Sequence, residues 1–355
     1  MNTATAESAT PCTLSGQRIV QIHPSLKCNL SCQHCYSSSG PFIKTELDPA
    51  IVCNLVSDAA RMGYEVISIS GGEPFLYSGL EQVLRHSKSL GLRTTVTTNG
   101  YFLRPRWLDE VRDLVDVLAI SLDGPRELHD AMRGANGAFD KVCSGVDQLR
   151  AYGMNFGFIH TLTYQTWEHM VWLGEFAAAQ GARLLQIHPL EMAGRAEEKL
   201  PGMRSGEDLL AKAYLLAFAM ALTYDGVMNV QLDVLEMEQV AAMPQLIYAD
   251  ELAAGWEDRV PADLLGLIVM EADGTVVPIS YGFARQYQIC NLREQSLRQS
   301  WARFVRNGYI AYRYLCRELF VELTNRNQPL MNWYEQVVAR SQVAASTSTA
   351  LPRAS

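Results

Sequence analysis

Residues 66–91 read VISISGGEPFLYSGLEQVLRHSKSLG, and this segment holds the pattern that decides the fold. Its first five residues form an apolar run typical of a buried strand. Pro74 prevents the strand from continuing, because proline has no N–H to donate. The stretch after Ser78 has the apolar spacing of a helix, with Ser78 and Glu81 in capping-box register and Gly91 at its end. The segment therefore predicts one strand–loop–helix unit.

The same unit repeats along the first two thirds of the chain. Helical patterns end near Gly63, Gly91, Gly153 and Gly181, which are spaced 28, 62 and 28 residues apart, and the wider interval contains two strands. Strand-like runs occur at six places: residues 18–22, 66–70, 94–98, 117–121, 156–161 and 184–188. Crossovers of about 30 residues require parallel strands. The pattern predicts an α/β barrel or open parallel sheet, with its chemistry in the loops after the strands.

The pattern changes beyond Pro189. A long helix is expected at 205–222, a hairpin around the turn at 272–274, and another helix at 292–306. The last stretch is rich in Ser, Thr and Ala without periodicity, which predicts disorder. The expected organisation is a flexible N-terminus at 1–16, a barrel domain at 17–200, a helical bridge with a smaller α+β C-terminal region at 201–340, and a disordered tail at 341–355.

Composition and charge narrow the function classes. The chain has 355 residues, of which 48% are hydrophobic, enough for one large core and a smaller one. Thirty basic against 38 acidic residues give a net charge of −8, the wrong sign for nucleic-acid binding. Residues 213–224, the longest nearly uncharged run, are too few to span a bilayer, and residues 1–16 lack an export signal. We therefore expect a cytoplasmic protein without nucleic-acid or membrane partners.

Three of the eight cysteines lie close together after the first predicted strand, in the sequence CNLSCQHCY at residues 28–36. Eight cysteines are too few for a disulfide framework in a chain of this length, so the group indicates metal binding. Three thiolates bind three irons of a four-iron, four-sulfur cluster and leave the fourth iron open to a substrate or cosubstrate. The alternative is a zinc ion held by these thiolates and a remote fourth ligand.

Three more loops carry small polar residues at predicted strand ends. The sequence GGEP follows the second strand at residues 71–74, TTNG closes the third at 97–100, and SLDG closes the fourth at 121–124. Paired glycines allow a ligand to approach the backbone closely, and Glu73 offers a carboxylate to an ammonium group. Because parallel strands end at one edge, these loops and the cysteine loop are expected to share one site.

The four motifs together resemble the radical S-adenosylmethionine (SAM) superfamily, over about residues 17–200. The resemblance implies a partial (βα)6 TIM barrel and one [4Fe-4S] cluster held by Cys28, Cys32 and Cys35. It also implies that one electron cleaves SAM, and that the resulting 5′-deoxyadenosyl radical removes a hydrogen atom from the substrate. Such an enzyme needs an external electron donor, such as flavodoxin or ferredoxin.

The same resemblance implies where SAM binds. The amino group of SAM is expected near Gly72 and Glu73, and its ribose near Ser121. Arg133, in the segment HDAMRG, matches an arginine that meets the cosubstrate carboxylate. The implied cofactor-binding residues are His34, Gly71, Gly72, Glu73, Pro74, Asn99, Ser121, Asp123 and Arg133.

A narrower resemblance lies in SLDGPRELHDAMRG, HPLEMAGRAEE and the hairpin ADGTVVP followed by NLREQSLRQSW, which look like the SPASM/twitch subgroup. Members usually carry auxiliary clusters, with a cysteine after the hairpin where this chain has Ile279. Only Cys290 and Cys316 lie beyond residue 143, too few for another four-iron cluster. We expect the auxiliary clusters to be lost, which favours redox-neutral outcomes such as epimerisation. Cys290 or Cys316 would then be a candidate hydrogen donor, the alternative being inert thiols.

Further polar residues near predicted strand ends are candidates for substrate contact. His23, His160 and His188 each follow an isoleucine, and they either line the substrate pocket, bond the backbone or form a second metal site. Glu191 and Arg195, after the sixth strand, either meet a polar substrate or pair at the surface.

The resemblance favours a maturase that modifies a ribosomally synthesised peptide. Only 27 residues precede Cys28, too few for a leader-binding domain, so we expect either a separate leader-peptide-binding protein or direct docking to the barrel. The second hypothesis is the same chemistry on a free small molecule such as an amino acid, sugar or nucleoside. The third is a non-catalytic zinc-binding protein.

Overall fold

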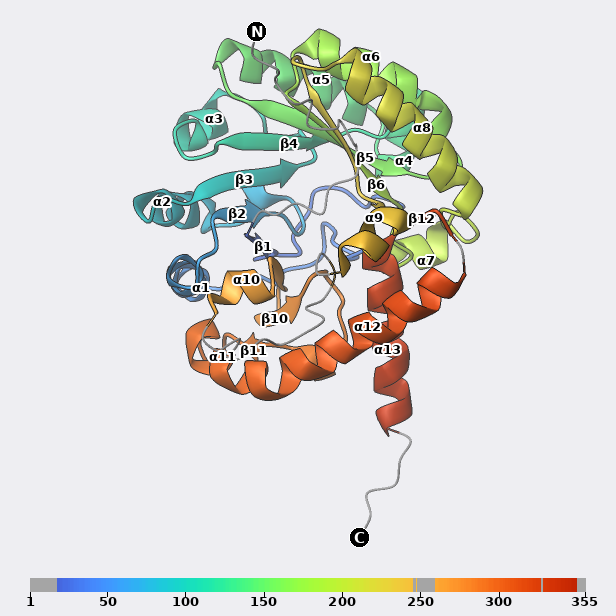
Figure 1. The fold of residues 1–355 in the computed structure, drawn as a ribbon. Coiled ribbons are helices and arrows are strands. Elements are labelled where there is room, and N and C mark those ends of the chain that lie inside the picture. The colour runs from blue at the N-terminus through green and yellow to red at the C-terminus, as the bar shows by residue number, and fades with distance from the viewer. Residues whose placement is uncertain (1–17, 245–246, 248–258, 327, 350–355) are drawn as a thin grey trace, which may run out of the picture.

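The computed structural model describes residues 18–244, 247, 259–326 and 328–349. The predicted flexible N-terminus at 1–16 lies outside them. A ten-stranded sheet runs through most of the fold in the order β11-β10-β9-β1-β2-β3-β4-β5-β6-β7. Its strands curve into a partial barrel with helices on the outside (Figure 1). The predicted α/β fold with a parallel sheet is therefore confirmed.

The six predicted strands form the middle of this sheet and run parallel to one another. Their bounds are β1 Ile19–Ile22, β2 Val66–Ile69, β3 Arg93–Thr98, β4 Val117–Ser121, β5 Phe156–Leu162 and β6 Leu184–Pro189. Apolar side chains of neighbouring strands, such as Ile22 and Ile69, are fully buried. This burial accounts for the continuous apolar runs in the sequence, because strands covered on both faces need few polar residues.

Two parallel strands were not predicted as parts of this sheet. Strand β7 (Asn229–Leu232) pairs with β6, and β9 (Leu267–Met270) pairs in parallel with β1. Strand β9 also forms the predicted hairpin with β10 (Thr275–Pro278), which pairs with β11 (Cys290–Asn291). The C-terminal region therefore extends the barrel sheet beyond β1. A separate two-stranded sheet joins β8 (Leu235–Glu236) and β12 (Leu330–Met331).

The helices that follow the strands are α1 Pro49–Arg61, α2 Leu80–Ser89, α3 Pro105–Val111, α4 Arg126–Arg133, α5 Ala138–Ala151, α6 Met170–Gln180, α7 Arg195–Lys199 and α8 Glu207–Thr223. Gly63, Gly91, Gly153 and Gly181 all have positive φ at or beside helix ends, as their spacing predicts. The predicted capping box of α2 is wrong. Ser78 donates to Glu46 instead, and the N-cap position is Gly79.

The remaining helices cover the C-terminal region. They are α9 Met237–Ala242, α10 Pro261–Leu264, α11 Leu297–Phe304, α12 Ile310–Asn325 and α13 Trp333–Thr349, with a π-helical turn joining α11 to α12. Helix α13 continues into the segment for which the sequence predicts disorder. The fully buried Ser341 accepts a hydrogen bond from Ala284 N, so tertiary contact orders a sequence without periodicity. The prediction is wrong for 341–349, and 350–355 lie outside the described residues.

Within the part of the chain that the structure describes, no helix combines the length and apolarity needed to cross a bilayer.

Candidate active site

The three predicted cluster cysteines lie in the long loop between β1 and α1. Cys32 is buried, and Cys28 and Cys35 are partly buried. Asn99 Nδ2 lies 3.7 Å from Cys28 Sγ, and Arg133 Nη1 lies 3.8 Å from Cys32 Sγ. Mainly burial raises the pKa of Cys28 to about 12, with weaker contributions from Glu73 and the other two thiols. The motif loops after β3 and β4 thus meet the cysteine loop, as predicted.

The described residues include no three His, Cys, Asp or Glu side chains close enough to bind a single metal ion. In a four-iron cube each thiolate binds its own iron, so the ligands stand further apart than those of one ion. Binding to a metal centre deprotonates a thiol. The guanidinium near Cys32 favours that charged form, so the residues around the loop fit a cluster.

The glycine pair after β2 packs against the cysteine loop. Gly72 N donates to Ser25 O at 2.9 Å, and Glu73 N donates to Lys27 O at 2.7 Å. A Cβ on Gly72 would lie 2.0 Å from Lys27 O. Gly71 has a φ of +107°, and its Cβ would lie 2.6 Å from Ser25 O. The close approach that these glycines allow is therefore that of the loop backbone, whereas the sequence predicts a ligand there.

Glu73 is buried, and its hydrogen bonds connect the loop after β2 to the end of β3. Its carboxylate accepts hydrogen bonds from Thr98 Oγ1 at 2.8 Å, from Asn99 N at 2.9 Å and from Phe75 N at 3.2 Å. Burial raises the pKa of Glu73 to about 7, although these three donors act in the opposite direction. Asn99 Nδ2 in turn donates to Asn29 Oδ1 at 2.9 Å. Glu73 thus helps to position the residue that faces Cys28.

The loop after β6 holds the cysteine loop from the other side. Arg195 Nε donates to Cys32 O at 2.8 Å, its Nη2 to Ser39 O at 2.7 Å, and its backbone N to Cys35 O at 3.0 Å. Gly194 has a φ of +57°, and a Cβ there would lie 2.3 Å from Tyr36 O. Arg195 thus contacts the backbone of the cysteine loop, a role that neither prediction for this residue anticipated.

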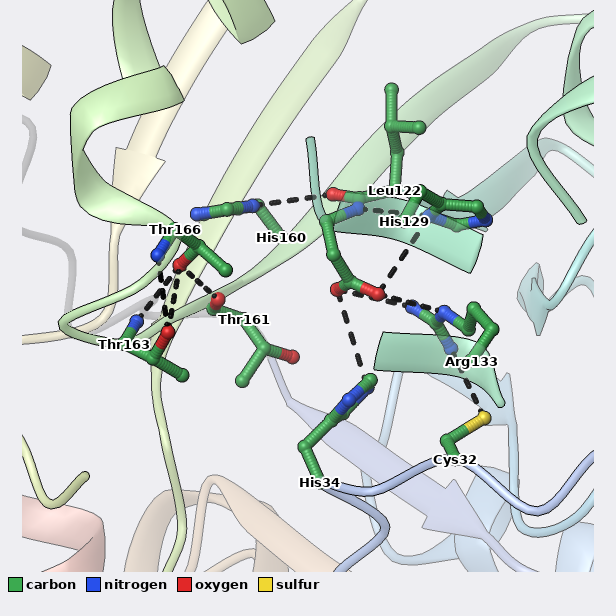
Figure 2. Close-up of polar contacts among 10 residues, drawn as sticks. Cys32, His34, Leu122, His129, Arg133, His160, Thr161, Thr163 and Thr166 are labelled. Carbon is green, nitrogen blue, oxygen red and sulfur yellow. Dashed lines mark hydrogen bonds and ion pairs between the residues drawn. The ribbon is translucent and has the colours of Figure 1, made fainter. Parts of the chain in front are cut away.

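Asp123, after β4, is fully buried at the centre of a polar network. Its partners Arg133, His129 and His34 are labelled in Figure 2. Arg133 Nε lies 2.8 Å from Asp123 Oδ2, and Arg133 Nη2 donates to Oδ1 at 3.2 Å. His129 Nδ1 accepts from Asp123 N at 3.1 Å, and His34 Nε2 lies 4.0 Å from Oδ1. Burial raises the pKa of Asp123, but the Arg133 guanidinium together with the neighbouring His34, His129 and His160 outweighs burial and holds that pKa well below its usual range.

Three histidines flank this carboxylate: His129 and His160 are buried, and His34 is partly buried. Burial lowers the pKa of His34, His129 and His160 to about 4, so these rings are neutral at pH 7. His160 Nδ1 lies 3.2 Å from Leu122 O, to which it can donate. Nδ1 of His34 and Nε2 of His129 and His160 have no hydrogen-bond partner among the described residues. Buried polar atoms without a protein partner suit a polar ligand at this edge of the sheet.

His23 and His188 lie in different surroundings. His23 stacks on Tyr281 with ring centroids 5.0 Å apart, and both its ring nitrogens lack a partner among the described residues. His188 pairs through Nδ1 with the carboxylate of Asp233, which also accepts from Gln186 Nε2 at 3.0 Å. Burial lowers the pKa of His188, but the carboxylates of Asp233 and Glu191 together raise it by more, so the net shift is upward. Burial raises the pKa of the neighbouring Glu191, which lies in this group instead of pairing with Arg195.

The two later cysteines lie in the packed C-terminal region. Cys290 in β11 has Asp58 and Arg303 as charged neighbours, and Cys316 in α12 contacts Tyr312. Burial raises the pKa of each thiol to about 12. None of their contacts among the described residues involves the cysteine loop. Their role as hydrogen donors stays a prediction.

The structure brings most predicted residues together and adds several that the sequence did not indicate. The thiols of 28–35, Asn99, Asp123 and Arg133 converge at one edge of the sheet. Ser121 ends β4 at the same edge, and Pro74 begins a short 3-10 turn beyond β2. The missed residues are Gly194, His129 and Asp233. His129 and Gly194 had a local signal, as they lie in the quoted segments SLDGPRELHDAMRG and HPLEMAGRAEE, whereas Asp233 had none.

Comparison with known proteins agrees with this geometry. Residues 22–177 match the sequence profile of the Radical SAM superfamily. The chain is 30% identical over 174 residues to the AdoMet-dependent heme synthase of Methanosarcina barkeri, which covers 48% of this chain and 50% of that protein. It is 32% identical over 176 residues to the mycofactocin maturase MftC of Mycolicibacterium smegmatis, a match that covers 48% of this chain and 44% of MftC. The chain thus spans about half the length of these curated relatives.

Solved structures share the fold at low sequence identity. Streptococcus suis SuiB bound to its precursor peptide SuiA superposes with a TM-score of 0.64 at 16% identity, over 84% of this chain and 66% of that one. The anSMEcpe structure with bound AdoMet superposes with a TM-score of 0.61 at 18% identity, over 93% of both chains. That overlap includes the SPASM-like C-terminal region. The profile match and the shared fold together show that residues 22–177 form a radical SAM domain.

Proposed function

We propose that this protein is a radical SAM enzyme with one [4Fe-4S] cluster, bound by Cys28, Cys32 and Cys35. The observation that carries the proposal is the buried Asp123–Arg133 pair, which contacts the sulfur of Cys32 at the edge where the motif loops meet. When bound, the cluster supplies the electron that cleaves SAM, and the resulting 5′-deoxyadenosyl radical removes a hydrogen atom from the substrate.

SAM binds, in this proposal, at the ends of β2, β3 and β4 beside the cysteine loop. The polar groups nearest the sulfurs support this position, since Asn99 and Arg133 each lie within 4 Å of a thiol. The unpartnered nitrogens of His34 and His160 provide further polar atoms at the same edge. The proposed contact residues are those that the family resemblance implies: His34, Gly71, Gly72, Glu73, Pro74, Asn99, Ser121, Asp123 and Arg133.

The number of clusters follows from the thiols that the chain offers. Cys290 and Cys316 are separately buried, and two thiols do not hold a four-iron cluster. Ile279, at the position where the subgroup usually has a cysteine, adopts a φ of +59°. We therefore propose a single cluster that an external flavodoxin or ferredoxin reduces.

The substrate that we propose is a ribosomally synthesised peptide. Support comes from the maturase MftC among the sequence relatives and from SuiB, which shares the fold and was solved with a precursor peptide. The His188–Asp233 pair and Glu191 provide polar groups for a substrate at the ends of β6 and β7. A leader-peptide-binding protein is a proposed partner.

A second candidate is a radical SAM enzyme that acts on a free small molecule. The observation that favours it is the sequence similarity to a heme synthase, at 30% identity over about the same share of this chain as the maturase. The extent of the similarity supports either substrate class, because each relative matches over 48% of this chain.

Anaerobic reconstitution with iron and sulfide tests the chemistry. We expect about four irons and four sulfides per chain, and conversion of SAM to 5′-deoxyadenosine after reduction with dithionite. The matched control replaces Cys28, Cys32 and Cys35 with alanine, which should remove essentially all iron and all cleavage. Stoichiometric zinc without SAM cleavage would overturn the proposal, and a count near eight or twelve irons would overturn the single cluster.

The substrate class has its own test. Short peptides encoded beside the gene are incubated with the reduced holoenzyme and SAM, and the peptide mass and 5′-deoxyadenosine yield are measured. A modified peptide, formed together with 5′-deoxyadenosine, supports the maturase. An unmodified peptide, with 5′-deoxyadenosine formation stimulated instead by a low-molecular-weight extract, would favour the small-molecule enzyme.

A further inference from the structure

The end of helix α4 is fixed directly against the cysteine loop. Gln33 N donates to Met132 O at 2.9 Å, and Gln33 Nε2 donates to Ala131 O at 2.8 Å. These bonds satisfy carbonyl groups at the end of the helix, which have no partner within it. Gly134 follows with a φ of +63°, and a Cβ there would lie 3.3 Å from Ser31 O. The backbone of Arg133, the last residue of α4, is therefore held at a set position beside Cys32.

The guanidinium of Arg133 is divided between two partners (Figure 2). Its Nε and Nη2 face the two oxygens of Asp123 at 2.8 and 3.2 Å, and its Nη1 faces Cys32 Sγ at 3.8 Å. The five N–H groups of a guanidinium have a fixed planar arrangement. The hydrogen bond from Nη2 and the ion-pair contact of Nε with Asp123 therefore leave Nη1 directed at the sulfur.

The charges around this pair favour a lasting contact. Asp123 is fully buried and Arg133 is 7% exposed. The histidines beside Asp123 lie further from its carboxylate than Arg133 does, with His129 Nδ1 at 3.7 Å and His34 Nε2 at 4.0 Å against 2.8 Å for Arg133 Nε. Arg133 is therefore the nearest cation to this carboxylate among the described residues, and a guanidinium keeps its proton. A buried carboxylate holds such a partner strongly, because losing it would leave an uncompensated charge.

We infer that Arg133 tunes the cluster by donating a charge-assisted hydrogen bond to the sulfur of Cys32, and that Asp123 is the residue that positions it. This inference rests on the proposed function. A reduced cluster carries more negative charge on its sulfurs, so an N–H donor stabilises the reduced form more than the oxidised form. Arg133 therefore raises the reduction potential and makes the cluster easier to reduce.

The family resemblance implies a different role, contact between Arg133 and the carboxylate of SAM. The two roles make different predictions for protein without SAM. A sulfur donor changes the potential whether or not SAM is present. A residue that only binds the carboxylate changes the affinity for SAM and leaves the SAM-free potential unchanged.

The experiment is a redox titration of the reconstituted full chain without SAM, followed by electron paramagnetic resonance. The test variant combines Asp123→Asn with Arg133→Gln, so that no single charge is left buried. The control combines Arg126→Gln with Asp140→Asn. These two residues form an exposed ion pair of the same residue types, and Arg126 is the first residue of α4. The affinity for SAM is measured on the same samples by equilibrium dialysis.

We expect the equilibrium constant for reduction to fall about tenfold in the test variant, a shift of about 59 mV to lower potential for a one-electron couple. The control should match the wild type. An unchanged SAM-free potential with weaker SAM binding would overturn the inference and favour the carboxylate role. If the test variant takes up no cluster, Arg133→Lys is titrated instead, and an unchanged potential there overturns the inference. If neither variant takes up a cluster although both fold, the pair builds the site and the tuning role is refuted. A wild-type chain without a four-iron cluster would overturn the proposed function itself.

Discussion

Replacing Asp123 with asparagine should destabilise the protein strongly, because it leaves a cation buried without a partner. Arg133 is 7% exposed and its ion pair with Asp123 has an Nε–Oδ2 distance of 2.8 Å. A guanidinium does not lose its proton in a protein, so Arg133 cannot escape the cost by becoming neutral. Breaking a buried pair by removing one partner costs about 3–5 kcal/mol. That is a large part of a typical free energy of unfolding of about 5–15 kcal/mol.

Urea unfolding at pH 7.5, followed by far-ultraviolet circular dichroism, measures this cost. The set comprises the wild type, Asp123→Asn, Arg133→Gln and the double variant, which form a double-mutant cycle. Each single variant leaves one uncompensated buried charge, whereas the double variant leaves none. We therefore expect the double variant to lose less stability than the two single variants together.

The matched control is Asp140→Asn, which removes the exposed partner of Arg126 and should not measurably change the free energy of unfolding. A loss of less than about 1 kcal/mol for Asp123→Asn, or effects that simply add in the cycle, would refute the argument from an uncompensated buried charge.

Three further changes test other parts of the site. Burial lowers the pKa of His23 to about 3. Below pH 6.5 the unfolded chain therefore binds a proton at this residue that the folded state excludes. As the pH falls from 6.5 to 3, His23 lowers the free energy of unfolding by about 1.4 kcal/mol for each pH unit. His23→Phe should remove that part of the slope in urea unfolding at pH 7 and pH 5, and an unchanged slope would contradict it. Arg195→Ala should lower the amount of iron that the chain retains after reconstitution and gel filtration, because Arg195 bonds the backbone of the cysteine loop. The control is Lys199→Ala, at an exposed residue of the same helix, which should retain the wild-type amount. Equal iron retention in the two variants would show that the Arg195 contacts do not hold the loop. Gly72→Ala should lower the free energy of unfolding by about 1–3 kcal/mol, because the added Cβ would overpack against Lys27 O. Differential scanning fluorimetry should then show a Tm several degrees lower. A wild-type Tm would argue against this close contact.

Local sequence patterns predicted the frame of the molecule well. The apolar runs and helix-ending glycines located β1 to β6 and the helices α1, α2, α5 and α6, because strand and helix periodicity depend on residues a few positions apart. The shorter helices α3, α4 and α7 were missed. The same patterns missed β9 as a neighbour of β1. Its run of LIVM indicates a strand, but nothing local shows that the strand returns across almost 250 residues to extend the sheet.

In the site, too, local features could be predicted from the sequence and contacts between distant segments could not. The spacing of Cys28, Cys32 and Cys35 in one loop is a local property, and so is the position of Asp123 directly after a strand. The partners of these residues come from distant segments. Arg195 is 163 positions from Cys32, whose carbonyl it binds, and Arg133 is 101 positions from the same residue.

By itself, then, the sequence determined the order of strands and helices, the edge at which polar loops gather and the number of clustered thiols. Only the tertiary structure decided that Gly72 makes room for the cysteine loop, and that Arg133 lies between Asp123 and a sulfur. The physical reason is the sequence distance between the residues that interact. Periodicity and turn formation are decided within a few residues, whereas a buried ion pair or a backbone contact depends on how loops far apart in the chain pack together.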